Sequence, residues 1–282
     1  MKQFLINPVL NKEFKLRFRS FKTFIGLVAY LLAIGLIVIG FIFMMTEFRR
    51  VGFFRPEESR SLFTMLSFLQ LALILFITPG LTAGVISGER ERQTLNILLT
   101  TVQSSTSIIL SKLFSSFSYL LLLIISSLPI YSVVFLFGGV SPMTLISVFG
   151  FYLFTIIAFA SLGVLFSTII RKTIVSMVTT YGVTLLLAGG TAFFFLIVMR
   201  FTQMQMQGVP TTNPTGYFLA MLNPPIVLGG ILTPEISEEM YRTTGIHFPL
   251  WVSYIIFYSI LTLIVLLISI CKLRPNMKPK NR

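Results

Sequence analysis

The composition is that of a membrane protein rather than of a soluble domain. The chain has 282 residues, 55% of them hydrophobic and 11% charged, whereas soluble domains contain about 25% charged residues. The formal net charge of +13 would suit nucleic-acid binding, but the basic residues flank apolar segments, which indicates membrane topology instead. We therefore expect no nucleic-acid partner. The single cysteine, Cys271, excludes an intrachain disulfide and is interpreted as a packing residue.

The first predicted element is a basic amphipathic helix over residues 7–22. Asn7 provides an N-cap and Pro8 stands at the first helical position. Such a helix lies in the plane of the lipid headgroups, held by apolar burial and by attraction to anionic lipid, so membrane lipids are an expected partner. The alternative is an ordinary basic flank without a defined helix. The side chains that define the interfacial helix are Leu10, Lys12, Phe14, Lys15, Phe18 and Arg19.

Six apolar runs follow, each long enough for a transmembrane helix of about 20 residues. The first begins too far into the chain for a simple leader and has no small-residue cleavage site after it. We therefore predict an all-α integral membrane protein, with one domain over residues 1–282, six transmembrane helices and both termini on one side. Small residues such as Gly35, Gly40, Gly80, Gly84 and Gly163 are expected to let helices approach closely. The six runs cover residues 23–45, 62–86, 105–137, 142–168, 174–199 and 250–271.

Charge predicts which side faces the cytoplasm. The side that holds both termini, the loop after the second span and Arg171-Lys172 carries 16 basic residues and three Glu residues, whereas the other side carries six of each. The positive-inside rule makes the first side cytoplasmic, including the basic tail over residues 272–282.

Several catalytic and transport mechanisms are disfavoured. The central part of each span has no ionisable side chain, although ion-coupled transporters usually carry intramembrane carboxylates. The chain has no Asp, its only histidine is His247 in a loop, and it has no phosphate-binding Gly-rich loop with Lys. We therefore expect that the chain is not an enzyme and binds no cofactor, and that any transport is driven by another protein.

Two polar interruptions are candidate functional segments. Residues 88–95 read Gly-Glu-Arg-Glu-Arg-Gln-Thr-Leu, and the leucines that follow recur at helical spacing, which predicts a short amphipathic helix over residues 88–103. The alternative is an ordinary charged loop. The segment 201–249 is predicted to be extracytoplasmic. In it, residues 203–216 are interpreted as a loop, and residues 217–232 as a re-entrant or interfacial hairpin or, with equal weight, a plain outer cap. Its defining residues are Tyr217, Asn223, Pro224 and Pro225.

Three stretches resemble bacterial ATP-binding-cassette type 2 permeases. They are Asn7-Pro8-Val9-Leu10-Asn11-Lys12-Glu13, residues 88–95 and Leu222-Asn223-Pro224, and they occur in the family's order across essentially the whole chain. The resemblance implies that the helix over 88–103 is a coupling helix that docks in a groove of a separate ATPase, with the interfacial helix nearby on the inner leaflet. The chain departs from the family at Gln93, where Gly is common, and near Val102, where Pro is common.

The expected function is that of the permease subunit of an exporter in the bacterial cytoplasmic membrane. Two permease chains, identical or paralogous, would form the substrate path, and ATP and Mg²⁺ would bind to the partner ATPase subunits. The arginines, Gln93 and Asn96 would face the ATPase, and the leucines would anchor the helix against the spans. The alternative is a non-transporting module for sensing, assembly or mechanical work at the outer face. The expected ATPase-coupling residues are Glu89, Arg90, Glu91, Arg92, Gln93, Leu95, Asn96, Leu98 and Leu99.

Overall fold

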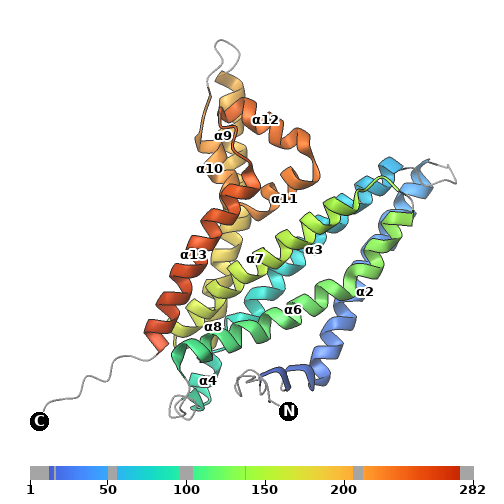
Figure 1. The fold of residues 1–282 in the computed structure, drawn as a ribbon. Coiled ribbons are helices and arrows are strands. Elements are labelled where there is room, and N and C mark those ends of the chain that lie inside the picture. Colours follow the sequence, from blue (N-terminus) through green and yellow to red (C-terminus); the bar gives the residue numbers. More distant parts are fainter. Residues whose placement is uncertain are drawn as a thin grey trace, which may run out of the picture.

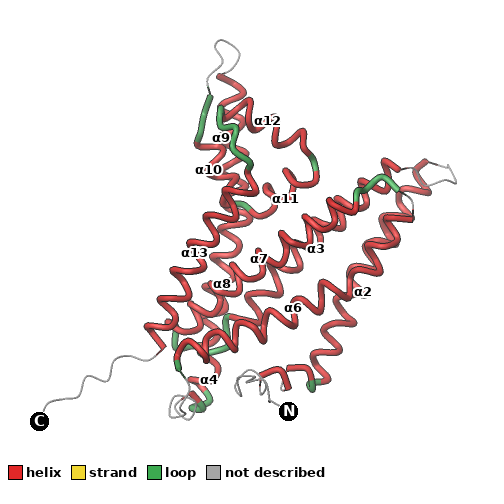
Figure 2. The backbone as a smooth tube through the Cα atoms, viewed as in Figure 1, coloured by secondary structure: helices red, strands yellow, loops and turns green. Residues whose placement is uncertain are grey.

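The computed structural model describes an entirely helical arrangement. It covers residues 13–15, 17–49, 56–95, 104–136, 138–205 and 212–273, and no strand occurs among them. Long helices run side by side and are joined by short loops (Figures 1 and 2). The predicted fold class is confirmed for this part of the chain.

The six predicted spans are confirmed as long apolar helices. The fifth is composite, because a short π-helix, η1, joins two α-helices within it, and the whole is apolar enough to cross a membrane over Thr173–Thr202. The helices that form the spans are α2 (Phe21–Arg49), α3 (Pro56–Thr82), α6 (Ser105–Leu136), α7 (Pro142–Ile169), α8 (Thr173–Leu185) with η1 (Leu186–Gly190) and α9 (Thr191–Gln205), and α13 (Leu250–Leu273).

The shorter helices lie at the two ends of these spans. The short helix α4 (Ser87–Glu91) lies at the end where α6 begins and α13 finishes, and we refer to this as the α4 end (Figure 1). The opposite end, here the α12 end, carries α10 (Thr215–Leu222), α11 (Pro224–Leu232) and α12 (Pro234–Thr244).

Helix α7 forms the centre of the bundle. Two-thirds (67%) of its most apolar window is buried, against 17% in α2 and 11% in the α8–α9 span. It packs against α3, α6 and α13. On the α13 side the rings of Phe159 and Tyr258 stack with centroids 5.7 Å apart. On the α3 side a Cβ added at Gly163 would lie 2.0 Å from Thr82 Oγ1, so only glycine allows this close approach.

The other predicted small-residue contacts divide into two groups. Gly80 and Gly84 lie against α8, where an added Cβ would be 2.8 Å from Tyr181 Oη and 3.1 Å from Met177 Cε, respectively. By contrast, an added Cβ at Gly35 or Gly40 of α2 would meet nothing within 4 Å. Close approach therefore occurs between α3 and its neighbours, whereas these two α2 glycines face open space within the described chain.

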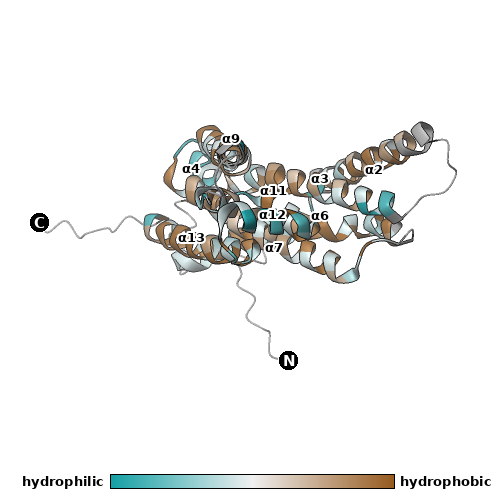
Figure 3. Cartoon of the chain, turned by 90° about the horizontal axis from the view of Figure 1, so that it is seen from above, coloured by the Kyte–Doolittle hydropathy of each residue, from teal (hydrophilic) through white to brown (hydrophobic). Residues whose placement is uncertain are grey.

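The segment at the α12 end contains more helix than the sequence patterns predicted. Helices α10 and α11 are apolar and meet at a 97° bend, so the re-entrant-like hairpin is confirmed as a bent helical pair. Helix α12 was not predicted. It begins with Pro234 at its first turn and ends at Gly245, whose φ of +73° is the left-handed conformation that glycine adopts readily. It is more hydrophilic than α13, which is largely brown in Figure 3.

Candidate functional site

Hydrogen bonds between two serine hydroxyls and backbone groups hold the turn between α3 and α4 against two other spans. The hydroxyl oxygen of Ser167 in α7 accepts hydrogen bonds from the backbone N–H groups of Ile86 at 2.8 Å and Ser87 at 3.0 Å. Ser176 of α8 donates a hydrogen bond of 2.7 Å to the carbonyl of Ala83. Residues 87–95, here called the α4 platform, therefore start from a fixed position at the ends of α7 and α8.

A buried lysine joins the platform to α6 and to the N-terminal segment. The side chain of Lys112 is only 3% exposed, and its Nζ lies 2.7 Å from Glu89 Oε1 and 3.0 Å from Glu13 Oε1. A buried ammonium group is tolerated when it is paired, because pairing offsets part of the cost of removing it from water. Glu89, one of the expected ATPase-coupling residues, thus points into the chain.

The next two charged residues of the platform also contact their own chain. Arg90 Nη2 donates a hydrogen bond of 3.0 Å to the carbonyl of Thr168 at the end of α7. The carboxylate of Glu91 accepts hydrogen bonds from the backbone N–H of Thr173 at 2.8 Å and from its hydroxyl at 2.7 Å. Because Thr173 begins α8, Glu91 satisfies an otherwise free N–H in the first turn of that helix.

The platform is not one unbroken helix, in contrast to the helix expected over residues 88–103. Helix α4 ends at Glu91, and Gln93 adopts a left-handed conformation with φ of +59°. The N–H of Thr94 bonds to the carbonyl of Glu89, and the N–H of Gln93 bonds to that of Arg90. This is a Schellman motif, in which the left-handed position is usually glycine. The motif stops α4 after five residues.

The platform exposes one short edge and buries another. Arg92, Gln93 and Thr94 are exposed, and Arg171-Lys172 in the adjacent α7–α8 turn is exposed too. Leu95 is 6% exposed and belongs to a cluster of buried residues from several helices: Ile86, Ile108, Ile109, Leu113, Val164 and Leu273. The remaining predicted coupling residues, Asn96, Leu98 and Leu99, lie outside the described residues.

The described part of the N-terminal segment lies beside the platform. Its short helical stretch turns away from the axis of α2 (Figure 1), and the rings of Phe14 and Phe18 are 6.0 Å apart. Lys15 and Arg19 are exposed. Arg17 Nη1 donates to the carbonyl of Ser115 in α6, and burial lowers the pKa of the guanidinium, opposed by the charge of Glu13. Leu10 and Lys12 of the predicted interfacial helix lie outside the described residues.

At the opposite end, one asparagine connects the bent helical pair to the π-helix. Asn223 is fully buried; its Nδ2 donates hydrogen bonds to the carbonyl of Ala188 at 2.5 Å and to Thr191 Oγ1 at 2.8 Å. Its Oδ1 accepts a hydrogen bond of 2.9 Å from the N–H of Ile226, which caps α11. Pro224 occupies the first turn of α11, where a missing N–H costs nothing. The Asn223-Pro224 pair therefore positions α11 against the fifth span.

Tyrosines attach the same region to α13. Tyr217 Oη donates a hydrogen bond of 3.1 Å to the carbonyl of Phe248 and lies 2.5 Å from Ser253 Oγ. Tyr258 Oη donates to the carbonyl of Leu222, just before the bend, at 2.8 Å. The second proline of the predicted hairpin, Pro225, lines an apolar cleft against α3.

The sequence patterns missed two groups of buried polar residues. Lys112 was counted only as a positive charge, because a lysine near the end of a span ordinarily extends its ammonium group to the membrane interface. Within the first four spans, Gln70 and Tyr152 are fully buried, and Tyr152 Oη donates a hydrogen bond of 2.7 Å to the carbonyl of Ser67. Gln70 and Tyr152, the second group, carry no charge, so the count of charged residues did not reveal them. No group of three or more His, Cys, Asp or Glu side chains suited to a metal ion occurs in the described ranges.

No protein-family model and no curated protein matches the chain. The chain is a multi-pass, all-helical membrane protein with six candidate spans. At one end of the bundle, polar contacts join the short helix α4 to α6, α7 and α8.

Proposed function

We propose that this chain is the permease subunit of an ATP-driven exporter of the ATP-binding-cassette type. In this proposal the α4 platform lies in the cytoplasm of a bacterial cell and receives movement from a separate ATPase subunit, to which ATP and Mg²⁺ bind. The single observation that carries the proposal is the connection of the platform to the ends of three spans by Lys112, Arg90 and Glu91.

Contacts with three spans make the platform stiff. An isolated helix of five residues would not be stable in water, because its few hydrogen bonds do not offset the unfavourable free energy of helix nucleation. Helix α4 is instead held by Lys112 of α6, Thr168 of α7 and Thr173 of α8. A force applied at the exposed Arg92–Thr94 edge would therefore move several spans together rather than deform a loop.

The structure changes which side chains are the best candidates for partner contact. Arg90 and Glu91 form hydrogen bonds with Thr168 and Thr173 of the same chain. By contrast, the side chains of Arg92 and Lys172 are exposed. We therefore assign recognition of the ATPase to Arg92, Gln93 and Lys172, and positioning of the platform to Glu89, Arg90 and Glu91.

A second permease chain, identical or paralogous, completes the proposed exporter. The most apolar windows of α2 and of the α8–α9 span are only 17% and 11% buried. These largely exposed apolar surfaces provide area for a second chain as well as for lipid. The cargo class that suits the apolar, aromatic-rich spans is hydrophobic or amphipathic.

The test combines affinity purification with charge reversal. We expect an ATP-binding-cassette ATPase, identified by mass spectrometry, to purify with the tagged chain from its native membrane. Arg92→Glu with Lys172→Glu should reduce its recovery at least tenfold and abolish ATP-dependent export. The matched control is Arg200→Glu with Arg242→Glu, two exposed arginines towards the α12 end, which should change neither. Equal ATPase recovery with both double variants would contradict the assignment.

A mechanical role without transport is the second candidate. The observation that favours it is the bonding of α11 to η1 through Asn223, which would transmit movement of the fifth span to the α12 end. The measurement that separates the two functions is flux in vesicles that contain the purified complex. ATP hydrolysis without movement of any hydrophobic or amphipathic test compound would favour the mechanical role.

A further inference from the structure

One face of α3 lines two separate clefts. Residues 60, 61, 64 and 65 line a cleft near the start of the helix, and residues 68, 71, 72, 75 and 76 line a second cleft farther along it. With 3.6 residues per turn, all nine positions fall on the same side of the helix. These nine residues therefore form one stripe along α3, which we call the α3 stripe.

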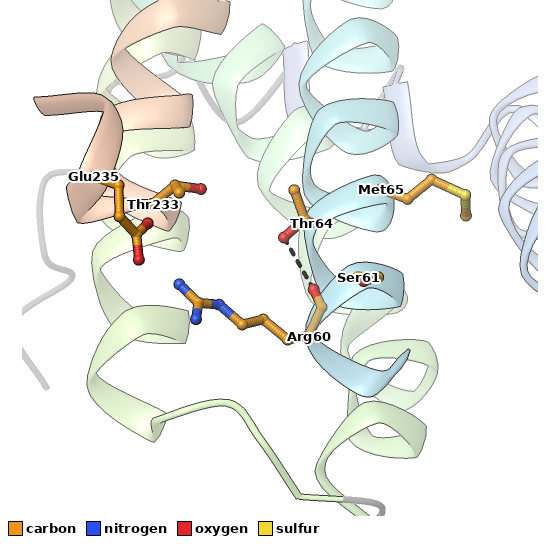
Figure 4. A pocket seen from close by; sticks show the side chains of 6 residues that line it. All are labelled: Arg60, Ser61, Thr64, Met65, Thr233 and Glu235. Carbon is orange, nitrogen blue, oxygen red and sulfur yellow. Dashed lines mark hydrogen bonds between the residues drawn. The ribbon is translucent and has the colours of Figure 1, made fainter. Parts of the chain in front are cut away.

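The cleft nearer the α12 end is polar. It has a volume of about 450 Å³ and is lined by Arg60, Ser61, Thr64, Met65, Thr233 and Glu235. Figure 4 shows the guanidinium of Arg60 reaching from α3 across the gap toward the carboxylate of Glu235 in α12. Both side chains are exposed. The cleft thus presents one positive and one negative group, close together, to a molecule that enters it.

The second cleft is apolar. It has a volume of about 430 Å³, and its lining comes from α3, the α8–η1 part of the fifth span and Pro225. The volume lies in the range of sites for small molecules, roughly 300 to 1,000 Å³. The hydroxyls of Tyr181 and Thr184 are the few polar side-chain groups in the lining.

The dimensions of the stripe match one leaflet of a bilayer. From Arg60 to Phe76 the helix rises about 24 Å, at 1.5 Å per residue. One leaflet with its headgroups is about 20 to 22 Å thick, half of the 40 to 45 Å of a whole bilayer. Arg60 lies in the second turn of α3, just before the apolar run at residue 62, and this places it at the level of the headgroups. The polar and apolar ends of the stripe therefore correspond to the headgroup and chain regions.

Phe68 is the first α3 residue of the apolar cleft, one turn beyond Thr64 and Met65 of the polar cleft, and α11 comes close to α3 here. A Cβ added at Gly229 would be 3.7 Å from the Phe68 ring, an ordinary van der Waals distance, so α11 lies close to Phe68 at this point. Phe68 nevertheless remains 38% exposed. A flexible hydrocarbon chain that passes from one cleft to the other would lie over this exposed face.

We propose that the α3 stripe binds one phosphatidylethanolamine molecule of the leaflet at the α12 end. Arg60 binds the lipid phosphate, Glu235 binds its primary ammonium group, and one acyl chain lies over Phe68 in the apolar cleft. Arginine suits phosphate because its planar N–H groups form paired hydrogen bonds. The negative charge of Glu235 disfavours purely anionic headgroups. The proposal does not depend on an ATPase partner, so it stands or fails separately from the proposed function.

The experiment uses the full-length chain in nanodiscs of phosphatidylcholine. The nanodiscs contain a small fraction of phosphatidylethanolamine with a photoactivatable diazirine on one acyl chain, and the cross-linked peptides are identified by mass spectrometry. We expect cross-links concentrated at residues 68–76 and 181–189. Unlabelled phosphatidylethanolamine should displace the probe at least tenfold more effectively than phosphatidylglycerol.

Four exposed positions provide the variants and their matched controls. Arg60→Gln and Glu235→Gln should each reduce cross-linking in the stripe about tenfold, as expected for loss of a charge-assisted hydrogen bond. Their controls, Arg242→Gln and Glu239→Gln on α12, should leave it unchanged. Ala72→Trp fills the apolar cleft and should also remove the cross-links, whereas Ala33→Trp on α2 should not.

Three results would overturn the proposal. Cross-links spread evenly over all exposed apolar helices would show only bulk lipid. Cross-links in the apolar cleft that are insensitive to Arg60→Gln and Glu235→Gln would remove the headgroup site. Absence of cross-links in both clefts, together with protection of the stripe in a chemically cross-linked dimer, would show that a second copy of the chain occupies this face instead.

Discussion

Different kinds of side-chain contact hold the helices in place at the two ends of the molecule. At the α4 end, charged side chains add to the hydroxyl contacts of Ser167 and Ser176. Lys112 bonds to Glu13 and Glu89, and Glu91 bonds to Thr173. At the α12 end, neutral groups make the contacts, mainly the amide of Asn223 and the hydroxyl of Tyr217. The difference follows the environment, because charges are tolerated near the membrane surface, where they can be paired or hydrated, whereas uncharged hydrogen bonds cost less to bury among apolar helices.

Removal of one side chain should therefore lower the free energy of unfolding for a different reason at each end. A charged network loses more when one partner is removed, because an uncompensated charge remains. A neutral network loses the hydrogen bonds and the caps that they provide. Substitutions at Lys112 and Asn223 test this difference between the charged and the neutral network.

Replacement of Lys112 should have the largest effect. Lys112→Met leaves Glu13 and Glu89 without their shared cation, and should lower the free energy of unfolding by roughly 3 kcal/mol, the lower part of the range for a broken buried pair because both carboxylates are partly exposed. The measurement is unfolding in detergent followed by circular dichroism. Lys172→Met, at an exposed position, should change the value by less than about 0.5 kcal/mol.

A further variant identifies the cause. If the loss comes from unpaired carboxylates, adding Glu13→Gln and Glu89→Gln to Lys112→Met should recover part of the stability. An equally unstable triple variant would show that the lysine stem, rather than its charge, stabilises the platform.

Replacement of Asn223 should have an intermediate effect. Asn223→Ala removes the cap of α11 and the donor to the Ala188 carbonyl, and should cost about 2 kcal/mol. Asn223→Asp keeps the capping oxygen but loses the N–H donors to Ala188 and Thr191 and places a carboxylate at a fully buried position, so it should destabilise at least as much as Asn223→Ala. Asn213→Ala, at a partly exposed turn, should cost less than about 1 kcal/mol. Equal losses for Asn213→Ala and Asn223→Ala would contradict a special role for the buried amide.

The smallest predicted effect is a gain. Gln93→Gly should raise the free energy of unfolding by about 0.5 to 1 kcal/mol, because Gln93 has a φ of +59° that glycine adopts without a steric penalty. Arg92→Gly is the matched control: Arg92 has an ordinary φ of −78°, so glycine there should destabilise by a similar amount. Destabilisation by both substitutions would argue against the left-handed turn as the end of α4.

Much of the fold could be predicted because an apolar run of about 20 residues is long enough to form a membrane-spanning helix. Six apolar runs became six long helices, and Asn223-Pro224-Pro225 correctly indicated a bend between two short helices. The end of α4 could not be predicted, because helical spacing of the leucines over 95–102 favours a continuous helix, whereas a single left-handed residue at Gln93 interrupts it. Helix α12 was missed because it is polar and follows two apolar helices, although Pro234 and Gly245 mark its ends.

Local sequence pattern was sufficient for the number of spans, their composition and the concentration of positive charge near one set of loops, since each depends on residues adjacent in the chain. Contacts between distant segments required the folded arrangement. Only packing of α6 against α4 brings Lys112 to Glu89, and only the approach of α8 turns Glu91 toward Thr173. The arginines and glutamates of the platform were therefore recognisable as a candidate functional segment, but which of these side chains point outward depends on neighbours up to 82 residues away.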